Sequence, residues 1–384
     1  MKIWHIYARH YNFGDHALGL AARNLFRQYF ASNVIFETVD THKLWIDSRK
    51  VDEINRDADF ILVGGGGLIH TFGLGGRAWM LHLPTSLVAH IAPRIGVFGV
   101  GFNQFRTESQ RLRPSVCRNL SAIQKQALFF SVRNDESKAC LTQNGIMADE
   151  IADPGFFLDG NYPEPKVGRP YAIVQLAFDS VADRGVDRDR LITGVNALID
   201  HIIARGLKVV LAPHCKPDIE ISNAVRAASR HRDDIHVWDY YESISDDWLP
   251  HQLGYYKYAE FVAGMRGHAQ IIPAGMGVPF LTLANHRKHR DLAIRLGMSD
   301  YCVEIGDDLA VELPPRMDAL LARRKELSSS LLAQTTTMRE NIAAYLQDAR
   351  IRFDRLPRMT LPTHYHLGRK GRSLRRRITD KIRY

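Results

Sequence analysis

The chain has 384 residues, of which 45% are hydrophobic, so it is long enough to bury a large core and to form two domains. Its net charge of +9 comes mostly from residues 369–384, which hold eight Lys or Arg and one Asp, so the basicity belongs to a tail and not to the whole surface. Because it has no apolar run of the roughly 20 residues that cross a bilayer, no signal-like N-terminus and no CxxC pair, we expect a cytoplasmic protein with reduced thiols and no zinc knuckle.

The first half of the chain alternates short β-branched or aromatic runs with longer amphipathic stretches, which is the pattern of βαβ units. We predict strands near Lys2–Ala8, Val34–Val39, Phe60–Val63, Ile95–Val100, Leu128–Val132 and Glu150–Ala152. We predict helices near Asp15–Phe30, Arg77–Ala92, Ser109–Gln126 and Asp135–Gln143. This alternation indicates the α/β class and a mostly parallel sheet.

Residues 160–170 contain three prolines and two glycines, and we predict that they link two domains, 1–160 and 171–350. After them the alternation restarts, and a long helix is expected near Pro315–Ala349 before a basic tail over 351–384. The predicted strands are Tyr171–Phe178, Leu207–Ala212, Ile235–Trp238, Phe261–Ala263 and Val278–Leu283. The predicted helices are Asp187–Ala204, Asp218–Arg230, Gly267–Ala274 and Arg287–Leu296.

In parallel sheets ligands bind beyond the carboxyl ends of the strands, so the segments that follow strands are the first candidates for a site. After the first strand comes Asn12-Phe13-Gly14-Asp15, where Gly14 permits close backbone approach and the helix start offers N–H groups to an anion. Asp15 is a candidate catalytic residue or, alternatively, only the helix N-cap.

Four consecutive glycines, Gly64–Gly67, follow the predicted strand Phe60–Val63. We expect a loop there in which Gly65 and Gly66 use positive φ angles or bring the backbone against a ligand. A merely flexible turn is the other interpretation. The stretch is neither a Walker loop nor a dinucleotide-binding GxGxxG motif.

Two further strand ends carry cations. Arg133, after the strand Leu128–Val132, is placed to grip a carboxylate or phosphate, or else to pair with Asp135 or Glu136. Arg266 and His268 stand two residues apart, so they converge on one ligand only at the irregular first turn of the next helix. We favour that functional interpretation over a buried structural histidine.

Three weaker candidates lie at the ends of other strands. His214 and Asp218 follow the strand Leu207–Ala212, and Lys288 follows Val278–Leu283 among several other basic residues. Lys288 would complete a ring of cations around an anionic ligand.

In this order, the motifs resemble those of the polysaccharide pyruvyltransferase family over about residues 1–300. The resemblance rests on an ordered series of short motifs, which here are Asn12/Gly14/Asp15, Gly64–Gly67, Ser131/Arg133/Ser137, Asp153-Pro154, His214/Asp218, Arg266/His268, Gly277/Pro279 and Lys288. It implies a GT-B-like fold of two Rossmann-type domains with phosphoenolpyruvate in the central cleft. It further implies no metal or other cofactor, and a sugar acceptor on a lipid-linked or nucleotide-linked glycan.

The roles that this resemblance suggests follow from the chemistry of a pyruvate ketal. Arg266 and Arg133 are expected to bind the carboxylate and phosphate of the trianionic donor. His268 is the expected proton donor, with His214 and His70 as substitutes, and the base for the sugar hydroxyl is Asp15, Asp153 or His214. Asn12, Gly14, Gly65, Gly66 and Lys288 are the remaining expected substrate-binding residues.

Two other functional classes stay open at this stage. A GT-B glycosyltransferase that uses a nucleotide sugar shares the fold, and a non-catalytic relative would bind an anionic glycan without turnover. The basic tail is expected to contact anionic lipid or acidic glycan, not nucleic acid, unless it is a solvated end without a partner. Contact with lipid would place the protein at the inner face of the membrane.

Overall fold

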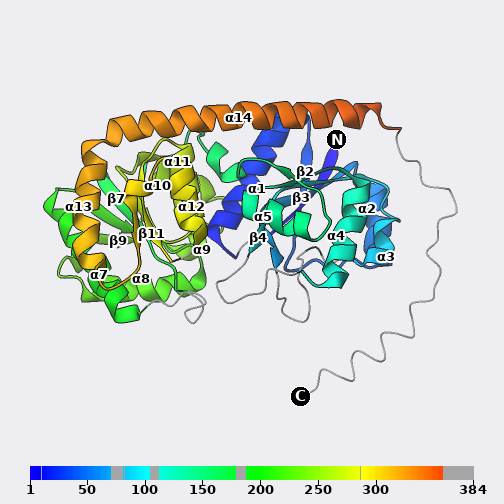
Figure 1. The fold of residues 1–384 in the computed structure, drawn as a ribbon. Coiled ribbons are helices and arrows are strands. Elements are labelled where there is room, and N and C mark those ends of the chain that lie inside the picture. Colours follow the sequence, from blue (N-terminus) through cyan, green and yellow to red (C-terminus); the bar gives the residue numbers. More distant parts are fainter. Residues whose placement is uncertain are drawn as a thin grey trace, which may run out of the picture.

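The computed structural model describes residues 1–9, 11–70, 81, 83–103, 112–178, 187–285 and 287–357. Two parallel sheets of six strands each stand side by side, with helices packed around them (Figure 1). The predicted α/β class, with two Rossmann-type units, is confirmed. The basic residues 369–384 lie outside the described part of the chain.

The first sheet has the strand order β2-β1-β3-β4-β5-β6. Its strands are β1 (Lys2–Tyr7), β2 (Ile35–Asp40), β3 (Phe60–His70), β4 (Arg94–Asn103), β5 (Ala127–Val132) and β6 (Asp149–Glu150). Its helices are α1 (Phe13–Leu25), which continues as a π-helix over Phe26–Phe30, α2 (Ser48–Asp57), α3 (Thr85–Val88), α4 (Pro114–Gln126) and α5 (Asp135–Gln143). The strand order reverses direction between β1 and β3, where doubly wound sheets bind ligands.

The second sheet has the order β12-β11-β10-β7-β8-β9, the dinucleotide-binding arrangement, with its reversal between β7 and β10. Its strands are β7 (Tyr171–Gln175), β8 (Lys208–Leu211), β9 (Ile235–Val237), β10 (Val262–Gly264), β11 (Phe280–Ala284) and β12 (Cys302–Glu304). Its helices are α7 (Arg188–Ala204), α8 (Lys216–Ala228), α9 (Tyr240–Ser243), α10 (Leu249–Tyr258), α11 (His268–Gly275), α12 (Arg287–Arg295), α13 (Leu309–Ala322) and α14 (Arg324–Arg355). Sequence patterns did not predict α9, α10 or β12.

The predicted glycine loop is wrong, because β3 runs on through Gly64–Gly67 to His70. The neighbouring strand β4 is long enough to keep pairing with it, and the register shifts between Gly66 and Ile69. Gly64, Gly65 and Gly66 all have positive φ, as expected, and a Cβ on Gly64 would overlap the carbonyl oxygen of Phe98. The glycines therefore allow an irregular strand to pass close to its neighbour.

Three predicted helix boundaries also differ from the structure. Within the predicted helix Arg77–Ala92, the described residues form only the short α3, and residues 77–80 and 82 lie outside the described part. Pro315 does not begin a helix but lies inside α13. The helix α14 reaches Arg355, so residues 351–355 belong to it and not to the predicted tail.

The two halves of the molecule are joined at two places. Phe13, the first residue of α1, donates its N–H to the carbonyl of His214 at 2.8 Å, and its ring packs against those of Trp238 and Tyr256. The long helix α14 extends along both sheets (Figure 1), and its Phe353 packs on Phe30 and Phe60 of the first half. The described helices include none that is both long enough and apolar enough to span a bilayer.

Candidate active site

A cavity of about 700 Å³ lies where the two halves meet. It is bounded by residues that follow strands of both sheets and by α12 and α14. The predicted site residues that line it are Asn12, Asp15, Arg133, Asp153, Arg266, His268 and Lys288. The structure thus brings together side chains that are up to 276 positions apart in the numbering of the chain, from Asn12 to Lys288.

Three of these side chains contact one another in the middle of the cavity. Nη1 of Arg133 lies 3.1 Å from Oδ2 of Asp153 and 3.0 Å from Nε2 of His268. Oδ2 of Asp153 is 3.8 Å from the same imidazole nitrogen. Because a guanidinium only donates hydrogen bonds, Nε2 of His268 accepts, so the neutral ring carries its proton on Nδ1. Arg133 therefore pairs with Asp153. The alternative prediction had paired it with Asp135 or Glu136.

Asp153 is the buried anchor of this cluster. Its side chain is 4% exposed, and Oδ1 accepts the N–H of Gly155 at 2.8 Å. Burial acts to raise the pKa of Asp153, but the neighbouring charge of Arg133 is the largest of the effects that lower it, and the pKa lies below its usual value. The carboxylate therefore stays ionised and holds the guanidinium of Arg133 beside the imidazole of His268.

Glycines make room for the side chains of His268 and Arg133. A Cβ on Gly14 would overlap Nδ1 of His268 and lie 2.6 Å from its Cγ, and a Cβ on Gly101 would overlap Nε of Arg133. Gly14 therefore does not contact the cavity but permits α1 and α11, from opposite halves, to approach closely. Gly101, near the end of β4, lies just beyond the predicted strand Ile95–Val100, and no sequence motif marked it as part of the site.

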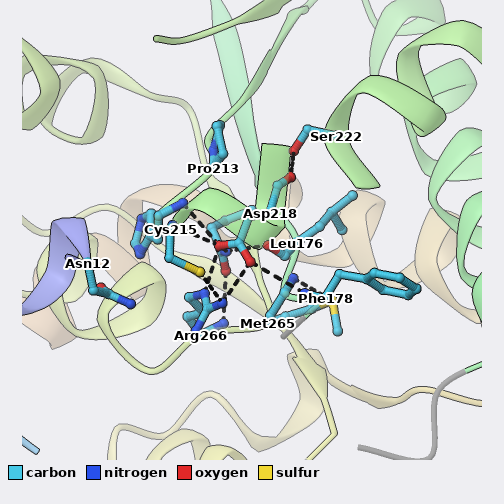
Figure 2. Close-up of polar contacts among 12 residues, drawn as sticks. Asn12, Leu176, Phe178, Pro213, Cys215, Asp218, Ser222, Met265 and Arg266 are labelled. Atoms are coloured by element: carbon cyan, nitrogen blue, oxygen red, sulfur yellow. Dashed lines mark hydrogen bonds and ion pairs between the residues drawn. The ribbon is translucent and has the colours of Figure 1, made fainter. Parts of the chain in front are cut away.

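Arg266 is held by a second buried carboxylate (Figure 2). Its Nε lies 2.8 Å from Oδ2 of Asp218, and its Nη2 lies 2.7 Å from Oδ1. Nη2 is also 2.8 Å from Sγ of Cys215, and the backbone N–H of Arg266 donates to Oε1 of Gln175 at 2.9 Å. These contacts fix the plane of the guanidinium at the edge of the cavity, where the second sheet reverses its strand order.

Asp218 is in turn held by the start of α8. Its Oδ2 accepts the backbone N–H groups of His214 at 3.1 Å and Cys215 at 3.2 Å, and the side chain is completely buried. A helix N-terminus stabilises a negative charge, which offsets part of the cost of burying the carboxylate. The His-x3-Asp spacing in the sequence placed Asp218 near this site, but it did not reveal the pairing with Arg266.

His214 lies behind the cavity and not in its lining. Its Nε2 is 2.6 Å from the hydroxyl of Tyr256, its ring stacks on Trp238, and it is fully buried. Burial, together with the charge of Arg266, lowers its pKa well below the ordinary value. It therefore stays neutral and packs the interface between the halves.

The remaining predicted residues lie around the start of α1. Asn12, and not Asp15, is the N-cap, because its Oδ1 accepts the N–H of Gly14 at 2.8 Å. Asp15 lies in the first turn, where a Cβ on Gly66 would lie 2.7 Å from its Oδ1. Gly65 packs against the backbone of Leu18 and does not line the cavity. Figure 2 shows Asn12 pointing toward the Arg266 group.

Lys288 also lines the cavity, at the start of α12. Burial lowers the pKa of the nearby His70, and the charge of Lys288 adds to this effect while that of Asp15 opposes it. Lys288 and Asp15 therefore face the same region at the end of β3.

Sequence reasoning missed one wall of the cavity. Met338, Asn341, Ile342 and Tyr345 line it from α14. Their spacing along a helix is a recognisable signal for a shared face, but nothing in the sequence says that this face meets a cavity and not a core.

Solved structures similar to this one have the GT-B fold. A putative UDP-N-acetylglucosamine 2-epimerase from Listeria monocytogenes matches with a TM-score of 0.55 and 15% identity, over 93% of this chain and 98% of that one. A UDP-GlcNAc 2-epimerase from Neisseria meningitidis, bound to UDP-GlcNAc, matches with a TM-score of 0.51 and 10% identity, over 86% and 94%. At such identities the likeness concerns the fold alone.

No curated protein sequence matches the chain. A family comparison, by contrast, covers most of it, from the N-cap Asn12 through the Arg133, Asp153 and Arg266/His268 segments to the start of α12. Because the model of the polysaccharide pyruvyl transferase family matches residues 12–287, the chain belongs to that family.

Proposed function

We propose that the protein transfers the enolpyruvyl group of phosphoenolpyruvate to a sugar of a cell-surface or exopolysaccharide precursor, where it forms a pyruvate ketal. The observation that carries this proposal is the convergence of Arg133, Arg266, His268 and Lys288 on one cavity. Phosphoenolpyruvate carries a carboxylate and a phosphate on the same carbon, C2, so its recognition needs several cations in fixed positions.

The two arginines are suited to bind this donor. Both side chains are largely buried, 13% exposed for Arg133 and 12% for Arg266, and each is oriented by its own buried aspartate. A guanidinium held in this way presents its remaining donors in a fixed plane and loses little entropy when an oxyanion arrives. Arg133 and Arg266 thus bind the phosphate and carboxylate, and Lys288 adds charge from α12.

His268 is the proton donor of the proposed reaction. Without ligand, Nε2 of His268 accepts from Arg133, and a trianionic donor placed between the cations favours the imidazolium form. The imidazolium then protonates the methylene carbon C3 of phosphoenolpyruvate, which leaves positive charge at C2.

The acceptor sugar completes the ketal with two of its hydroxyl groups. One hydroxyl adds to C2 and passes its proton to a base, inorganic phosphate leaves with that proton, and the second hydroxyl adds to the same carbon and returns its proton to His268. We assign the base to Asp15, which lines the cavity beside Asn12. Asp153 is committed to Arg133, and His214 is buried outside the cavity lining.

A product assay tests the proposal. The protein is incubated with phosphoenolpyruvate and a panel of lipid-linked and aryl glycosides, and phosphate release is compared with the amount of pyruvylated sugar found by mass spectrometry. Equal amounts of the two products are expected. Transfer of a sugar from a nucleotide sugar, without use of phosphoenolpyruvate, would overturn the proposal in favour of a glycosyltransferase.

A further inference from the structure

The cavity is larger than the proposed donor requires. Its volume of about 700 Å³ is within the range of pockets that hold drug-sized ligands, whereas phosphoenolpyruvate is smaller than a single hexose. Three of the groups assigned to the donor, Arg133, His268 and Arg266, lie around Asp153 and Asp218. The rest of the lining therefore leaves space for a second molecule.

The helix α14 supplies a separate wall with a different chemistry. Met338, Asn341, Ile342 and Tyr345 occupy positions i, i+3, i+4 and i+7, so they form one stripe that faces the cavity. Three of these side chains are apolar or aromatic, and Asn341 places an amide between them. Leu292 of α12 continues the apolar surface toward Ile271 of α11.

The lining beside this wall, from α5, β6 and α12, carries several carboxylates. The positive charge of Arg295 is matched by Asp135 at 3.1 Å and Glu150 at 3.5 Å, and all three residues line the cavity. Asp291, also in the lining, adds a further carboxyl group to this part. A trianion is disfavoured beside these carboxylates, whereas the hydroxyl groups of a neutral sugar can donate hydrogen bonds to them.

Tyr345 offers a fixed aromatic surface within this wall. Its hydroxyl donates to Oδ2 of Asp149 at 3.1 Å, and its ring packs edge-on against Phe129 at 5.8 Å between centroids. Burial, with the charge of Asp149, raises its pKa, so the hydroxyl stays protonated. A ring held at both ends loses no freedom when a flat, partly apolar ligand packs on it.

We infer that the part of the cavity between α12 and α14 is the acceptor subsite, which takes one neutral hexopyranose ring against Met338, Asn341 and Tyr345. The inference rests on the proposed function, since it assigns the second substrate of that reaction. The family match includes Arg133, Asp153, Arg266 and His268 but ends at residue 287, before α14. The donor residues thus lie inside the family match and α14 lies outside it. This is expected if the donor site is common to the family and the acceptor site is particular to this chain.

The test replaces the amide of Asn341 and measures the KM of each of the two substrates. Asn341→Leu keeps nearly the size of the side chain and does not lower the helix propensity, so the fold is preserved, but it removes the hydrogen-bonding group. We expect the KM for p-nitrophenyl hexopyranosides to rise about tenfold, while the KM for phosphoenolpyruvate stays the same. Gln347→Leu is the matched control, because Gln347 is an exposed amide on the same helix outside the cavity lining.

A second variant and a binding measurement separate this inference from the proposed function. Asn341→Trp fills the subsite, so we expect glycoside binding in calorimetry to be lost while phosphoenolpyruvate still raises the melting temperature. If the wild type forms pyruvylated sugar but both variants bind and use glycosides normally, the inference is wrong and the proposed function stands. If glycosides bind in an Asn341-dependent way but no pyruvyl transfer occurs, the subsite stands and the proposed function fails.

Discussion

Gly14 of α1 lies directly beneath the imidazole of His268 on α11, so close that a Cβ at position 14 would overlap Nδ1 of the ring. The two residues belong to opposite halves of the molecule and are 254 positions apart. The Asn-x-Gly-Asp motif therefore contributes to the site by leaving space, in addition to capping α1 through Asn12.

This contact predicts the effect of a single methyl group. Gly14→Ala should push the ring of His268 away from Arg133 and Asp153 and lower kcat by about 10²-fold, the typical cost of a misplacement near 1 Å. Steady-state kinetics and thermal melting are the measurements. Gly306→Ala is the control, since a Cβ there meets no atom within 4 Å. Unchanged kcat in Gly14→Ala would show that the position of His268 does not matter for turnover.

The assignment of His268 as proton donor predicts a loss of chemistry without a loss of binding. His268→Gln should lower the rate of the chemical step by ~10²–10⁴, the range for a lost general acid. Phosphoenolpyruvate should still raise the melting temperature, because the arginines remain. Single-turnover kinetics measures the step directly. A variant with near-normal turnover would require another acid, such as His70.

Arg266 and Asp218 are expected to act as one unit. Arg266→Ala should weaken phosphoenolpyruvate binding strongly, and Arg266→Lys should not restore it, because lysine lacks the planar fork that meets both oxygens of Asp218. Asp218→Asn should weaken binding in the wild type but have little further effect in the Arg266→Ala background. Calorimetric titration measures the affinity for phosphoenolpyruvate of each protein in this double-mutant cycle.

The control for this cycle is Glu220→Gln, which makes the same charge change at an exposed position of α8. If Asp218→Asn weakens binding equally with and without Arg266, Asp218 acts through the general fold and not through the guanidinium. Thermal melting of each variant shows whether the buried charges left behind unfold the protein.

Acid should destabilise the protein through His5. Burial, with the charge of Arg23, lowers the pKa of His5 to about 3, whereas the unfolded chain titrates near 6.5. Between these values the unfolded state binds more protons, so stability falls as the pH is lowered from about 6.5 toward 3. At pH 5 this amounts to about 2 kcal/mol.

Replacing His5 should remove that part of the pH dependence. In His5→Gln, the free energy of unfolding from urea titrations is expected to fall less steeply between pH 7 and pH 5 than in the wild type. The exposed His251 serves as the control position, with His251→Gln expected to leave the slope unchanged. Equal slopes in His5→Gln and the wild type would contradict the prediction.

The basic residues 369–384 are expected to associate with anionic membranes, where a lipid-linked acceptor would be found. Deleting them should weaken sedimentation with phosphatidylserine vesicles, especially at low salt, and leave turnover on a soluble glycoside nearly intact. Vesicles of neutral lipid are the control. Loss of folding in the truncated protein would show instead that this segment is part of the core structure.

The sequence by itself determined the fold class and most of the residues that gather at the cavity. Strand and helix periods are local signals, and a motif at the end of a parallel strand has to face the ligand-binding edge of its sheet. For that reason Asn12, Arg133, Arg266, His268 and Lys288 could be singled out without coordinates, whereas Asp153 was indicated only by the family resemblance. The failure of the predicted glycine loop has a tertiary cause, since β3 continues there only because β4 runs alongside it.

Only the tertiary structure decided which side chains pair. The same local signals made His214 and Asp15 equal candidates for a base, and only their burial and position separate them. The pairs Arg133–Asp153 and Arg266–Asp218, the space that Gly14 leaves for His268, and the face of α14 that meets the cavity all join segments distant in the chain. Such contacts depend on how the two sheets and α14 are packed against one another, and the periodicity of a single segment carries no information about that packing.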